Sequence, residues 1–166
     1  WLSGDDLAEA EQAEVLTAAW LEGGVSAVWS NHVFIDEAGH IAGPCLGSDH
    51  PYTLNICDYA DGRFLDFIYA GTCGYPRSVI DRFGPLPAHL GSRGLEHHFG
   101  FRAALLGTKR YVPRQLMRRR IHPNRTSHGA NAKDRLTDPM VVHERQLRVR
   151  LQVLLGCRDT LLKSVE

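Results

Sequence analysis

The chain has 166 residues, 43% of them hydrophobic, and its 19 Lys and Arg balance 19 Asp and Glu, so the formal net charge is zero. This length and composition suit a single domain over residues 1–166 with a sizeable core, and they argue against a disordered chain. No apolar run approaches the roughly 18 residues of a membrane-spanning helix, and no basic-then-apolar leader marks secretion, so we expect no membrane partner.

The first part of the chain predicts a helix and then a strand. Ser3 can cap a helix over residues 3–23, because Asp6 follows three residues later and acidic side chains fill the first turns. Two glycines end this helix. Residues 25–35 then have the pattern of a strand, and residues 37–39 that of a turn.

The middle of the chain predicts a hairpin. Residues 52–59 alternate in the manner of a strand, with Tyr52, Leu54 and Ile56 on one side. Residues 60–62, Ala-Asp-Gly, are typical of a hairpin turn, and residues 63–70 are the expected partner strand.

The later segments predict a mixture of helices and strands. Residues 76–83 and 113–121 each open with a proline and favour helices. Residues 95–106 fit either a strand or a helix. Residues 141–155 have a strand-like period of two that a helix also tolerates. We therefore expect an α+β fold: an antiparallel sheet with an N-terminal helix and one or more helices packed on one side.

Charge is distributed unevenly along the chain. Residues 1–66 carry twelve acidic residues and one arginine, whereas residues 93–150 carry fourteen Lys and Arg and four acidic residues. Two such halves attract one another, within one chain or across a dimer, and we expect a homo-oligomer. The basic half can also face an anionic ligand, although no nucleic-acid-binding motif accompanies its arginines and their pairing with the acidic half is the favoured interpretation.

The cysteines indicate a reducing compartment. The four cysteines show no CxxC spacing and no dense disulfide framework, so we expect free thiols and a cytoplasmic protein.

Nine histidines offer candidate metal ligands and acid–base groups. His32 lies within a predicted strand and His50 immediately before another, so paired strands could bring both imidazoles to one ion. The alternative interpretation is that His40 and Asp49 lie in solvent-exposed loops and that His32 is half-buried in its strand.

Two further segments could contribute to such a site. If residues 95–106 form a strand, adjacent His97 and His98 point to opposite faces, and Glu96 can orient one of them. Glu144 could supply a carboxylate, and two histidines with one carboxylate are the usual ligands of ferrous iron. The alternatives are a histidine pair at a strand edge and an exposed glutamate paired with arginine.

One set of residues resembles the 6-pyruvoyl- and 6-carboxy-tetrahydropterin synthases, which have the T-fold. The resemblance rests on Ser30-Asn31-His32, Cys45, Ser48-Asp49-His50-Pro51-Tyr52, the Gly62–Phe67 run and Leu95-Glu96-His97-His98, which follow the family's order. Ser48 stands where that family has another histidine.

This resemblance implies a zinc site and a proton-transferring thiol. His32 and His50 would be zinc ligands and Cys45 the thiol. His97 would assist the transfer together with Glu96 or Asp66.

A second set resembles the vicinal oxygen chelate metalloenzymes, including the ring-cleaving extradiol dioxygenases. His97 to Arg102 resembles the metal-binding first strand of that module, and Asp138-Pro139 followed by Glu144 resembles its end. The resemblance implies ferrous iron held by His98 and Glu144, with His32 or His50 as the third ligand.

Both resemblances imply a metal-dependent enzyme, a lyase or a dioxygenase, that uses zinc or ferrous iron on a small polar substrate containing a ring. Arg102 and Arg110 could hold a carboxylate of the substrate, and Tyr52 could contact it. A module that binds nucleic acid or an acidic partner through residues 93–150 is the alternative.

Overall fold

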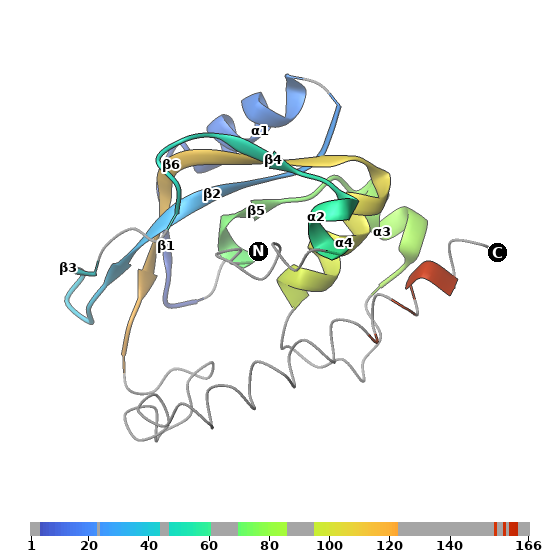
Figure 1. Ribbon diagram of the computed structural model, residues 1–166. Helices are drawn as coiled ribbons and strands as arrows, with labels where there is room; N and C mark the ends of the chain where they lie inside the picture. Colours follow the sequence, from blue (N-terminus) through green and yellow to red (C-terminus); the bar gives the residue numbers. More distant parts are fainter. Residues whose placement is uncertain are drawn as a thin grey trace.

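The computed structural model (Figure 1) describes residues 4–22, 24–43, 47–60, 70–85, 95–122, 155, 158 and 160–162. Its elements, in chain order, are β1 (Leu7–Ala8), α1 (Gln12–Leu21), β2 (Val25–Ile35), β3 (Ile41–Gly43), β4 (Tyr52–Leu54), α2 (Ile56–Ala60), η2 (Ala70–Thr72), β5 (Cys73–Gly74), α3 (Ser78–Phe83), α4 (Leu95–Leu106) and β6 (Thr108–Arg120). Helices and strands therefore both contribute, and the predicted α+β class is confirmed. Within the described ranges, no helix has the length and apolarity needed to cross a membrane.

The two long strands, β2 and β6, form the centre of a six-stranded sheet. They run parallel, with partners from Val25↔Thr108 to Ile35↔Arg120. β1 and β4 pair with β6, and β3 and β5 pair with β2, all antiparallel. The sheet is therefore mixed, and the predicted purely antiparallel sheet is wrong. Two parallel strands must be joined by a long crossover connection. Here that connection contains the helices α2, α3 and α4.

Helices cover both faces of this sheet (Figure 1), not one side as predicted. On one face, Leu16 of α1 packs against Val28 and Leu116. On the other, Ala103 of α4 packs against Ala27 and the α3 residues Val79 and Phe83. Ala27 and Val28 are neighbours in β2, and neighbouring strand residues point to opposite faces. β2 is thus a central strand buried on both sides.

The N-terminal helix begins nine residues later than predicted, at Gln12. Residues 7–8 instead form β1 against β6, where Leu7 pairs with Arg118. Asp6 does not cap a helix, since its carboxylate accepts a hydrogen bond from the Arg120 amide at 2.9 Å. Tertiary pairing with β6 has overridden the local capping pattern.

The predicted strand over residues 52–59 is wrong beyond Leu54, because α2 begins at Ile56. The Asn55 side chain accepts from the Cys57 amide, and Asp58 accepts from the Asn55 amide, both at 2.7 Å. This reciprocal arrangement resembles a capping box and starts a helix where the apolar alternation predicted extension. The turn at residues 60–62 and the partner strand at 63–70 lie outside the described residues, except Ala60 in α2 and Ala70 in η2.

The predicted helix over residues 113–121 is also wrong, because these residues belong to β6 apart from Ile121. Pro113 lies where the register against β2 shifts, between the partners of Ser30 and Asn31. At such an irregularity a residue without an amide hydrogen can be accommodated in a strand.

Other predicted elements are confirmed. β2 has the predicted bounds, 25–35, and α3 lies within the helix predicted over residues 76–83. Gly39 has a φ of 93° in the predicted turn, a conformation that glycine adopts without strain. Residues 95–106, left open between strand and helix, form α4.

Candidate functional site

Two of the predicted metal ligands, His32 and His98, come from a central strand and a helix. Both are buried. His32 lies towards the end of β2, whereas His98 belongs to α4, which packs through Ala103 on Ala27 near the start of β2.

His32 is held neutral in the interior. Burial, and secondarily the positive charge of Arg119, lowers the pKa of His32 to about 4, and Asp6 opposes this shift. Its ring lies edge-on to Phe34, with centroids 5.2 Å apart. A neutral imidazole is the form that binds metal ions. The same neutral ring can equally pack in the interior without binding a metal.

His50 lies two residues before β4, close to the start of a strand as predicted. Its side chain is exposed. Its amide donates to the Ser48 hydroxyl at 3.1 Å. The segment before β4 is fixed to the sheet, because the Gly47 amide donates to the Asn31 side chain at 3.1 Å and the Tyr111 hydroxyl donates to the Ser48 carbonyl at 3.0 Å.

Cys45, Asp66 and Glu144 lie outside the described residues. Glu96 and His97 lie in the first turn of α4, and their side chains are likewise outside the description. His97 and His98 do not point to opposite faces of a strand as predicted, because they lie in the helix α4, where successive residues differ in direction by about 100°.

The predicted substrate-binding arginines have partners within the protein. Arg102 is buried, donates to the Gly84 carbonyl at 2.6 Å and lies over the Phe83 ring. Arg110 pairs with Glu22. In the described ranges, no group of three or more His, Cys, Asp and Glu side chains could hold a metal ion.

The most unusual chemical environment in the described residues surrounds Lys109 of β6. Its side chain is only 1% exposed, and its amine lies 5.2 Å from the centroid of the Trp29 ring. A fully buried lysine is rare, because removing an ammonium ion from water costs several kcal/mol. Burial lowers the pKa of Lys109 to about 8, although the nearby Cys73 and Asp58 oppose the shift.

The Trp29 ring beside this amine packs with two tyrosine rings from the neighbouring strands β4 and β6. The Trp29 ring lies 5.6 Å from both Tyr52 and Tyr111, and the two tyrosines are 4.8 Å apart. Cys73 and Leu54 complete the cluster. The predicted contact residue Tyr52 therefore belongs to an aromatic wall next to Lys109. We call these residues, with Lys109 and Asp58, the lysine site.

The alternation of β6 explains how the lysine site forms. Lys109 and Tyr111 are two residues apart and point to the same face, and their register partners on β2 are Ala27 and Trp29. Leu54 and Tyr52 of β4 are their partners on the other side. The helices α3 and α4 pack on this face beyond Ala27. Lys109 is thus at the centre of the sheet rather than at its edge.

Three arginines of β6 on the opposite face are paired with N-terminal acidic residues. The ion pairs are Arg110–Glu22, Arg114–Glu11 and Arg118–Glu9. The attraction predicted between the acidic and basic parts of the sequence therefore operates within one chain for these residues.

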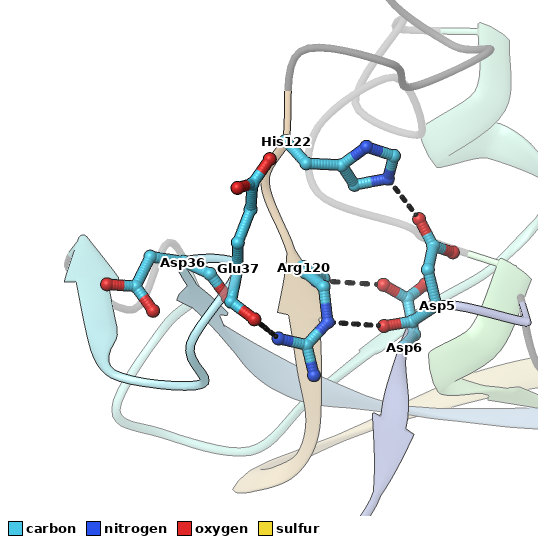
Figure 2. A network of polar contacts seen from close by, with 6 residues as sticks. All are labelled: Asp5, Asp6, Asp36, Glu37, Arg120 and His122. Atoms are coloured by element: carbon cyan, nitrogen blue, oxygen red, sulfur yellow. Dashed lines mark hydrogen bonds and ion pairs between the residues drawn. The ribbon is translucent and has the colours of Figure 1, made fainter.

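Arg120, at the end of β6, is the centre of a polar network (Figure 2). Its guanidinium donates to the Asp5 carbonyl at 3.0 Å and to the carbonyls of Asp36 and Glu37 at 2.8 and 2.7 Å. His122 lies 2.7 Å from the Asp5 carboxylate. The network ties the N-terminal segment and the β2–β3 turn to β6, which is a structural role.

Comparison with known protein families, with characterised proteins and with solved structures found no match to this chain. The chemistry of the described side chains is therefore what a functional proposal can rest on.

Sequence patterns do not identify the lysine site. Lys109 precedes Arg110 in the basic part of the chain, residues 93–150, and nothing in the sequence distinguishes it from the other basic residues there. One signal is that Lys109 and Tyr111 are two residues apart in β6 and so point to the same face, to which Trp29 points from β2. That signal has meaning only once the register of β2 and β6 is known.

Proposed function

We propose that this protein is an enzyme acting on a small carbonyl compound, with the Lys109 amine as its reactive group. The burial of that amine at the centre of a sheet, over the Trp29 ring and the two tyrosines that pack with it, carries the proposal. Lysines in apolar surroundings serve as nucleophiles because they lose their proton more readily than exposed ones.

The chemistry would be imine formation. The neutral amine attacks the carbonyl carbon of the substrate, the carbinolamine loses water, and a carbon–nitrogen double bond links the substrate to Lys109. Trp29, Tyr52 and Tyr111 would flank a flat ring on the substrate through stacking contacts. The substrate in this proposal is a small polar compound containing a ring, which is the substrate class that both family resemblances imply.

A substrate must reach an amine that is 1% exposed. The segment that carries Asp58, α2, has five residues, and its Ile56 and Cys57 are exposed. Short elements with few buried contacts open at low free-energy cost. Movement of α2 would therefore provide access in this proposal.

Reductive trapping tests the proposal. The protein is incubated with a small aromatic aldehyde and borohydride across a pH series, and each lysine is quantified by peptide mass spectrometry. The chain holds three lysines, 109, 133 and 163, so two act as internal references. Lys109 should be modified first, with a midpoint near pH 8, whereas ordinary lysines titrate near pH 10.4. Slower labelling of Lys109 than of the other two at every pH would reject the proposal.

A metal-dependent reaction is a second candidate, favoured by the neutral, buried imidazole of His32. Among the described residues no group of three His, Cys, Asp and Glu side chains completes a site with His32, and we derive no step through a metal. Elemental analysis of protein purified without chelator tests it. About one zinc or iron per chain that is lost in His32→Ala but retained in His40→Ala, at an exposed position, would support the metal, and no bound zinc or iron after reconstitution would exclude it.

A further inference from the structure

Three arginines of β6 form a row, and three glutamates from the N-terminal part of the chain cover it. We call Arg110, Arg114 and Arg118 the arginine row, and Glu22, Glu11 and Glu9, which pair with them in that order, the acidic cover. The glutamates lie in or beside α1, between Glu9 next to β1 and Glu22 at the end of the helix. The pairing order shows that this segment runs alongside β6 in the opposite direction.

The acidic cover is held weakly at each contact. The middle pair, Arg114–Glu11, has about half of each side chain exposed, 53% and 48%. Exposed ion pairs of this kind contribute only about 0–1 kcal/mol each, since water and salt screen them. A ligand with a denser row of negative charges can therefore replace these carboxylates.

The spacing of the arginine row selects a polymer. Successive arginines are four residues apart, which is roughly 13 Å along a strand. One phosphate group cannot bridge that distance, whereas a DNA strand advances about 3.4 Å per nucleotide and presents a phosphate at each step. Arginine forks also match phosphate oxygens in pairs.

We propose that the arginine row is a binding surface for the phosphate backbone of nucleic acid and that the acidic cover competes with the nucleic acid for it. A phosphate backbone has the advantage over carboxylates, because its binding releases condensed counterions. The intact protein then binds weakly and only at low salt. Removing the negative charges of the acidic cover turns it into a tighter binder. This inference is independent of the lysine site, which lies on the other face.

The experiment compares two triple variants with the same change in net charge. One removes the acidic cover, Glu9→Gln with Glu11→Gln and Glu22→Gln. The matched control removes three exposed acidic residues elsewhere, Glu37→Gln with Asp49→Asn and Asp81→Asn. Binding to a labelled single-stranded oligonucleotide of mixed sequence is measured by fluorescence anisotropy from low to physiological salt, and circular dichroism checks that each variant is folded.

The first variant should bind about tenfold or more tightly than the control at low salt. Its salt dependence should be steeper by about two in log–log slope, as expected for three phosphate contacts at about 0.7 each. Adding Arg114→Gln to it should reduce that slope. If the triple variant does not fold, Glu11→Gln alone should show a smaller gain over Asp81→Asn.

Two outcomes would overturn the inference. Equal affinity of the two triple variants would mean that only net charge matters. Competition by polyglutamate as effective as competition by unlabelled oligonucleotide would mean that the row accepts acidic polypeptides.

Discussion

The Lys109 amine lies over the indole ring of Trp29 on the adjacent strand β2, at 5.2 Å from the ring centroid, although the register partner of Lys109 on that strand is Ala27. The electron-rich face of an indole attracts a cation, and this attraction offsets part of the cost of burying the ammonium group. The offset is incomplete, since burial still lowers the pKa of Lys109 to about 8. Near neutral pH a usable fraction of the amine is therefore unprotonated.

Substituting Lys109 should separate its chemical from its structural role. Lys109→Met keeps the length of the side chain and removes the buried charge, so the free energy of unfolding should change little or rise by about 1 kcal/mol. The same variant should lose trapping by an aldehyde. Lys109→Ala is the comparison, because it leaves a cavity and should cost about 2–4 kcal/mol. Urea unfolding measures both, and a Met variant as unstable as the Ala variant would show that the charge itself holds the fold.

Stability should decrease in mild acid because of His32. The pKa of His32 is about 4 in the folded protein and 6.5 when unperturbed, so the unfolded chain binds a proton more readily. The stabilising contribution is complete above pH 6.5 and is lost as the pH falls from 6.5 towards 4, by up to about 3 kcal/mol. Urea titrations between pH 4 and 8 should show this loss.

A matched pair of variants assigns that loss. His32→Gln should flatten the stability profile between pH 4 and 6.5, whereas His40→Gln, at an exposed position, should leave its slope as in the parent. An unchanged slope in His32→Gln would assign the acid sensitivity to other groups.

Gly47 should not tolerate any side chain. A β-carbon there would overlap the Tyr111 hydroxyl and lie 2.6 Å from the Asn31 amide oxygen. Gly47→Ala should therefore lower the free energy of unfolding by about 1–3 kcal/mol, as overpacking does. Gly4→Ala is the control, since a β-carbon at Gly4 meets nothing within 4 Å. Thermal denaturation compares the two, and equal melting temperatures would contradict the close approach of this turn to Tyr111.

Arg120 should hold two distant segments on the end of β6. Replacing it with Gln removes the donors to Asp5, Asp36 and Glu37 and leaves carbonyl oxygens without them, at a cost of about 2 kcal/mol. Hydrogen exchange should then accelerate at the amide of Gly39, which donates to the Asp36 carbonyl at 3.1 Å. Arg77→Gln, which breaks an exposed ion pair on α3, should leave this amide unchanged.

Local patterns were sufficient where neighbours in sequence decide the structure. The strand at residues 25–35, the turn around Gly39 and α3 depend on short-range apolar patterning, on glycine and on proline, and all three are present as predicted. They failed at residues 113–121, whose arginine-rich sequence suits a helix in isolation. There, partners on β2 from Asn31 to Ile35 impose extension.

The candidate site was predicted only in fragments. Tyr52 lies in the lysine site, but the sequence does not distinguish Lys109 from the other basic residues of 93–150. His32 and His98 lie on β2 and α4, and how these two elements pack depends on contacts between residues far apart in sequence.

The sequence by itself determined the α+β class, the long strand β2 and the attraction between an acidic N-terminal part and a basic later part. Only the tertiary structure decided that β6 is a strand parallel to β2, that Lys109 is buried against Trp29, and that each arginine of the row faces a glutamate. Composition and periodicity are local properties, whereas register, burial and ion pairing arise when distant segments meet.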